Sequence, residues 1–140
     1  GLWLASILRT RVNLMSNQIK VQLKTEWIES NVLETQQPIK TYTITTTSDL
    51  KREDTQVVGT THELIALGDI TDDAFVKIEN KHATAMVQVG LEVAAAFVGV
   101  IDIPAGGPPA ILPRASTLAA TYLKSDTAST PVRVTLIKVV

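Results

Sequence analysis

The stretch from Phe75 to Val100 reads FVKIENKHATAMVQVGLEVAAAFVGV, and it decides the fold expected for the chain. Its segments Phe75–Lys81 and Met86–Val93 are rich in β-branched and other apolar residues, which favour half-buried strands. The residues HATA between them are typical of a turn. The pattern predicts two strands joined as a hairpin, with Asn80 either in a left-handed conformation or capping the turn through its side chain.

The composition favours a β fold with an aliphatic core. The 140 residues are 45% hydrophobic but only 4% aromatic, so Val, Ile, Leu and Ala must fill the interior. Cysteine is absent, which excludes a disulfide framework and a cysteine zinc site. The net charge of −1 gives no basic face for nucleic acid. No apolar run approaches the ~20 residues of a membrane span, so neither nucleic acid nor membrane is an expected partner.

The first fourteen residues, GLWLASILRTRVNL, are expected to form an N-terminal arm, either as a short amphipathic helix or as an extended segment. An apolar arm packs on a neighbouring subunit or folds back on its own sheet. Arg9 and Arg11 follow the apolar run, whereas the basic residues of a secretory signal precede it. The candidate partner contacts in the arm are its apolar side chains, Leu2, Trp3, Leu4, Ile7 and Leu8.

Residues 15–140 are expected to form a single domain. The period-two alternation that begins at Ile19 predicts a half-buried strand, and Ile39–Thr47 predicts an edge or surface strand. The polar residues 29–37 indicate a loop. The charged cluster 49–54 indicates a solvated loop, with an ion-pairing contact to another subunit as the alternative.

A proline-rich stretch and two strands complete the chain. Residues 101–114 contain four prolines and two adjacent glycines, which predict an extended loop or hairpin tip. Alternation predicts a strand over 118–123 and a final strand from Val132 whose Val132, Val134 and Leu136 face the core. The candidate partner contacts in the loop are Ile103, Pro104, Pro108, Pro109, Ile111 and Leu112.

Seven or eight strands at intervals of about ten residues are typical of an all-β fold. The sequence therefore predicts an antiparallel β-sandwich over residues 15–140, with the arm of residues 1–14 before it. A jelly-roll-like topology is favoured over an immunoglobulin arrangement.

The side chains that do chemistry form no recognisable catalytic pattern. His62 and His82 lie in different segments, and the acids of Asp69–Asp73 lack the alternating oxygens and final Glu of a calcium loop. No serine stands in a Gly-x-Ser-x-Gly setting, and no pair of glutamates is singled out for glycoside cleavage. We therefore expect no enzymatic activity, no cofactor and no metal.

Five segments of the second half carry a family resemblance: FVKIENK from Phe75, MVQVGL from Met86, IDIPAG from Ile101, LAATYLK from Leu118 and VRVTLI from Val132. This succession of strands and turns resembles the C-terminal half of small virion proteins of tailed bacteriophages, over about residues 73–140. The turn after Ile101 departs from the family's compact form because GGPPA at residues 106–110 lengthens it.

The resemblance implies a head decoration, or cement, protein on the capsid exterior. Its implied partners are the major capsid protein and further copies of the chain, as a dimer or trimer on the particle. A tail or head–tail joining component is the nearest alternative. A glycan-binding jelly roll for host recognition is another, for which Trp3, Trp27, Tyr42 and Tyr122 are the available stacking residues.

Overall fold

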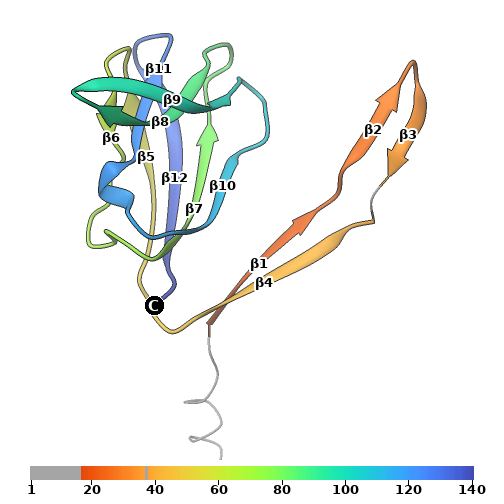
Figure 1. Cartoon of the computed structure of the whole chain (residues 1–140), viewed down its shortest axis with the longest axis horizontal. Helices are drawn as coiled ribbons and strands as arrows, with labels where there is room; N and C mark the ends of the chain where they lie inside the picture. The colour runs from red at the N-terminus through yellow and green to blue at the C-terminus, as the bar shows by residue number, and fades with distance from the viewer. Residues whose placement is uncertain (1–16, 37) are drawn as a thin grey trace, which may run out of the picture. The chain divides into compact units, whose positions relative to one another are not determined.

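The computed structural model describes residues 17–36 and 38–140, the side chains of 33–36 excepted (Figure 1). The chain divides into two compact units, residues 1–47 and residues 48–140. We call them the hairpin unit and the sandwich. The division differs from the expected single domain over residues 15–140, because the boundary falls after Thr47. The expected arm, residues 1–14, lies outside the described residues.

The described part of the hairpin unit forms two antiparallel strand pairs. Strand β1 (Asn17–Leu23) pairs with β4 (Lys40–Thr46), and β2 (Glu26–Glu29) pairs with β3 (Val32–Gln36). The prediction of a loop over residues 29–37 is wrong for most of its length. Ser30 and Asn31 adopt positive φ angles of 49° and 66°, which match the right-handed twist of a two-residue hairpin turn. This turn allows the polar residues on both sides to pair as strands.

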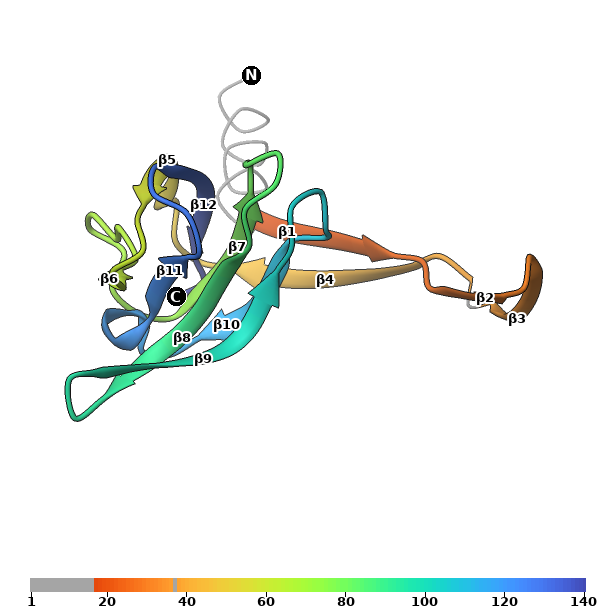
Figure 2. The ribbon, with the colours of Figure 1, turned by 90° about the horizontal axis from the view of Figure 1, so that it is seen from above.

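The sandwich contains two four-stranded antiparallel sheets, as predicted (Figures 1 and 2). One sheet has the order β10-β7-β12-β5, and the other has the order β6-β11-β8-β9. A 3-10 turn, Leu118–Ala120, precedes β11. Because the predicted strand over 118–123 begins in this turn, only its second half is extended. The strands are β5 (Lys51–Val58), β6 (Glu63–Leu64), β7 (Ala74–Asn80), β8 (Val87–Val93), β9 (Ala96–Ile103), β10 (Ala110–Ala115), β11 (Tyr122–Ser125) and β12 (Thr130–Lys138).

Aliphatic side chains from both sheets fill the core, as the composition predicted. Val132, Val134 and Leu136 of β12 are all buried, which confirms their inward alternation. β12 is a central strand that pairs with β5 on one side and β7 on the other. Its alternate residues therefore pack against neighbours from β7 and against the facing sheet. Other fully buried members are Val58, Val76, Ile78, Val87, Leu118 and Leu123.

The segment Phe75–Val93 does not form the predicted hairpin. β7 and β8 belong to different sheets, so the chain crosses the sandwich between them. Asn80 holds this crossing: its Nδ2 donates to the carbonyls of Ala85 (2.7 Å) and Ile103 (2.9 Å), and its Oδ1 accepts from the His82 amide (3.0 Å). The capping role proposed for its side chain is thereby confirmed. The hairpin lies instead between β8 and β9.

Two loop predictions also change. The charged residues 51–54 begin β5 and are not a loop. They occupy an edge strand, where charged side chains remain in water. The proline-rich stretch is a loop only between β9 and β10, because Ala110–Ala115 pairs with β7. Pro113 is accommodated because β10 is also an edge strand, with its register shifting between Leu112 and Ala115.

Candidate interaction surfaces

The hairpin unit exposes an unusual number of large apolar side chains. Each of its sheets has two strands, and an isolated two-stranded sheet is marginally stable because it has no second layer to pack on. Among its described side chains only Ile19 and Thr46 are buried. The exposed ones are between 47% and 64% accessible: Leu23, Trp27, Ile28, Val32, Ile39 and Tyr42.

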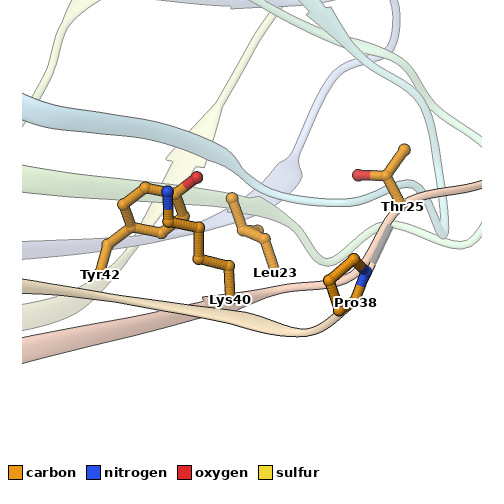
Figure 3. A pocket seen from close by; sticks show the side chains of 5 residues that line it. All are labelled: Leu23, Thr25, Pro38, Lys40 and Tyr42. Carbon is orange, nitrogen blue, oxygen red and sulfur yellow. The ribbon is translucent and has the colours of Figure 1, made fainter. Parts of the chain in front are cut away.

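Part of this apolar surface forms an open pocket (Figure 3). An open depression of about 340 Å³ is lined by Leu23, Thr25, Pro38, Lys40 and Tyr42. Leu23 pairs with Lys40 across β1 and β4, so their side chains share one face of the pair. The Lys40 ammonium lies 5.0 Å from the centre of the Tyr42 ring, a cation–π contact. The lining of the depression therefore combines apolar and aromatic side chains with one cation, Lys40.

A second apolar surface lies on the β8–β9 hairpin, which projects from the sandwich in Figure 2. Val87 and Val89 are buried, but Leu91 and Val93, which continue the same face of β8, are exposed. Val98 pairs with Leu91 and is exposed as well. The core-facing row of β8 therefore extends beyond the core.

The opposite face of this sheet carries a cluster of rings around His62. Its Nε2 lies 2.8 Å from Oε2 of Glu92. The imidazole stacks on Phe97 at 5.5 Å between ring centres and meets Tyr122 edge-on at 5.3 Å. Sequence reasoning missed this cluster because its members come from four segments. The pairing of β8, β9 and β11 supplies the proximity, and the contacts join the residues before β6 to the sheet.

Glycine makes room for the Phe97 ring. A Cβ on Gly90 would lie 2.0 Å from the Val98 carbonyl oxygen and 2.9 Å from the ring. The Gly in the Val-x-Val-Gly segment is thus required by close approach of β9 and its aromatic side chain.

Several charged side chains of the sandwich form ion pairs with one another. Arg133 bonds Glu53, and the hydrogen bond it donates is the main cause that lowers the pKa of the Glu53 carboxyl. A hydrogen bond from Lys81 likewise lowers the pKa of Glu79. In the acid cluster, Asp72 pairs with Lys138 and Asp73 with Arg114. The pairs made by Arg133, Lys138 and Arg114 connect segments of the sandwich that are distant in the sequence.

The described residues contain no group of three or more His, Cys, Asp and Glu side chains placed to hold a metal ion. Within the same residues, no helix is long and apolar enough to cross a membrane.

The structure separates the sequence-predicted contact candidates into four groups. Those of the arm, Leu2 to Leu8, lie outside the described residues. Pro104, Pro108 and Pro109 are exposed, whereas Ile111 and Leu112 are partly buried. Ile103 is only 1% accessible and belongs to the core. Its candidacy as a surface contact is therefore wrong: Ile103 ends β9 on the inward side, and the loop begins one residue later.

The apolar surface of the hairpin unit was not among the predicted protein contacts, although Trp27 and Tyr42 were named as stacking residues for the glycan-binding alternative. The sequence signal for this surface was the pair Trp27 and Ile28 within a polar segment. The structure shows that both side chains are exposed. Comparison of the chain with protein-family models, with curated proteins and with solved structures finds no match. A function must therefore be inferred from the surfaces themselves.

Proposed function

We propose that the chain is a non-enzymatic structural protein of a tailed-bacteriophage virion, a capsid decoration protein that binds across major capsid protein subunits on the outside of the head. The observation that carries the proposal is the hairpin unit, with its six large apolar side chains in water. Such a surface is typical of a protein–protein contact. The resemblance of residues 73–140 to virion proteins supports the choice of partner.

The two units suit different parts of this role. A cement protein stabilises a shell by burying surface on more than one subunit, and a stable contact buries about 800 Å² on each partner. Full burial of one large apolar side chain contributes about 1.5–3 kcal/mol. The hairpin unit offers side chains of this kind, and the sandwich offers a rigid body. The exposed prolines 104, 108 and 109 add a loop that loses little entropy when it docks.

The order of the strands supports a jelly roll as the finer description of the sandwich. From β5 to β12 the chain changes sheet at every connection except β8–β9. The first and last strands of the sandwich in chain order, β5 and β12, are neighbours in one sheet. Folding an antiparallel strand ribbon over a core produces this interleaving of early and late strands.

The test is co-sedimentation of the purified chain with phage capsids that lack it. The double variant Trp27→Ser with Ile28→Ser is expected to lose at least about tenfold in affinity, because two apolar contacts disappear. The matched control is Val57→Ser, an exposed valine on β5 of the sandwich. Deletion of residues 2–14 is also expected to weaken attachment while the sandwich stays folded. Equal binding of the double variant and the control would contradict the proposal.

A tail or head–tail joining component is the second candidate. A separate hairpin unit suits a ring as well as a shell, since it can reach from one subunit to the next. Copy number in purified particles separates the two functions. Hundreds of copies support decoration, whereas a dozen or fewer support a tail or joining role.

A further inference from the structure

The edge strands of the sandwich differ in how they are protected against pairing with another chain. Exposed edges invite such pairing, and native proteins block it with charge, proline, irregular register or short length. β5 carries four consecutive charged residues at 51–54. β10 contains Pro113 within a register shift, and β6 is only two residues long. Three of the four edges are thus protected.

β9 is the edge without this protection. It runs for eight residues with a single charge, Asp102, which already accepts a hydrogen bond from Gln88 (3.1 Å). It contains no proline. Val98 and Val100 are 44% and 64% accessible. Within the described part of the chain β9 pairs only with β8, so its outer edge is open.

We propose that β9 pairs antiparallel with β9 of a second copy, joining the two β6-β11-β8-β9 sheets into one sheet of eight strands. A strand added to this edge must itself be nearly uncharged and apolar, and β9 meets that requirement. In the joined sheet Val98 would lie beside Val98 of the other copy, on the face that carries Leu91. The contact is isologous, so it closes as a two-fold dimer.

The irregularity of β9 limits the possible register. The shift in its pairing with β8 falls at Val100 and divides the exposed edge into two regular parts, Ala96–Gly99 and Ile101–Ile103, of which the first is the longer. A two-fold axis at Val98 places Val98 beside its own copy and Phe97 beside Gly99. The two Asp102 carboxylates are then eight residues apart along the strands, roughly 26 Å, so their repulsion is weak. The proposal does not depend on the proposed virion role.

The first test measures the mass of the full chain by analytical ultracentrifugation over a range of concentrations. The chain is expected to dimerise, and Val98→Lys is expected to raise the dissociation constant at least about tenfold, because two like charges would meet across the strands. The control Val57→Lys adds the same charge to an exposed valine on the protected edge β5 and should leave dimerisation unchanged. Circular dichroism establishes that both variants are folded.

The second test uses the absence of cysteine from the chain. Directly opposite residues in an antiparallel pair have Cα atoms about 4.5–5.5 Å apart, within the reach of a disulfide. Val98→Cys is therefore expected to form a covalent dimer under mild oxidation, and Val57→Cys is not. A monomer at every concentration would overturn the proposal. So would a dimer that Val98→Lys does not weaken, or one in which Val57→Cys cross-links as readily as Val98→Cys.

Discussion

The hairpin unit and the sandwich are built from the same kind of β-forming sequence, yet they treat apolar side chains in opposite ways. β4 and β12 are both rich in β-branched residues, Thr and Ile in β4 and Thr, Val and Ile in β12, but β12 has a strand on each side and a facing sheet. Among the described strands, β4 has one neighbour, β1. The same propensity therefore gives a buried strand in one unit and an exposed one in the other. Most of the buried aliphatic side chains belong to the sandwich, whereas most of the large apolar side chains of the described hairpin unit are exposed.

The largest difference between the units is expected in the free energy of unfolding when one leucine of each is replaced by alanine. Leu123 is fully buried in the sandwich, whereas Leu23 in the hairpin unit is 50% accessible. Leu123→Ala should lower the free energy of unfolding by about 2–5 kcal/mol because it leaves a cavity. Leu23→Ala should change it by no more than about 0.5 kcal/mol. Chemical denaturation measures both, and similar losses would remove the distinction between the units.

The close packing of the β8–β9 pair predicts a somewhat smaller effect. Gly90→Ala would push a Cβ into the Val98 carbonyl and the Phe97 ring, at a cost of about 1–3 kcal/mol. Gly59 has no atom within 4 Å of a built Cβ. Gly59→Ala should therefore be nearly neutral in thermal unfolding. A tolerated Gly90→Ala would show that β9 can move away from β8.

Removing a hydrogen-bonding side chain should also lower the free energy of unfolding more in the sandwich than in the hairpin unit. Asn80→Ala leaves the buried carbonyls of Ala85 and Ile103 without their donor, which is expected to cost about 1–3 kcal/mol. Gln22→Ala removes an exposed bond to Thr41 in the hairpin unit and should cost no more than about 0.5 kcal/mol. Denaturant unfolding compares them. Equal losses would mean that the Asn80 contacts do not hold the crossing.

The smallest expected effect is that of the ion pair between Arg133 and Glu53. Arg133 lowers the pKa of Glu53 in the folded chain, so this pair stabilises the fold above the ordinary carboxyl pKa of 4.5 and loses its effect as the pH falls through the lowered value. Arg133→Gln should return the Glu53 pKa toward its ordinary value, as followed by an NMR titration. Lys51→Gln, which removes a weaker influence, should shift it less. The reverse order would contradict the pairing.

The sequence predicted the parts of the fold that depend on local pattern. The alternation in β12, the aliphatic core and the capping side chain of Asn80 all follow from neighbouring residues. The pairing of strands does not, because the same turn residues can close a hairpin or cross between sheets. The His82–Ala85 segment crosses because Asn80 bonds the Ile103 carbonyl, a residue far along the chain.

The contact surfaces were harder to predict for the same reason. Ile103 was assigned to a loop because of the prolines after it, yet the sheet extends far enough to bury it. The expectation of a single domain rests on the length of the chain, and length does not show which strands share a core. Only the three-dimensional structure shows that no third strand joins either of its described pairs. The grouping of His62, Glu92 and Phe97 likewise required the register of β8 and β9.

The claim that the sandwich is the stable unit and the hairpin unit is the binding surface is tested most directly by hydrogen exchange. The exchange is measured on the free chain and on the chain bound to phage capsids. Slow exchange marks backbone that opens only with global unfolding. In the free chain we predict slow exchange for β7 and β12 and fast exchange for residues 17–46. Binding should slow exchange in residues 17–46 by at least about tenfold and leave β12 unchanged. Protection of residues 17–46 in the free chain equal to that of β12 would contradict the account.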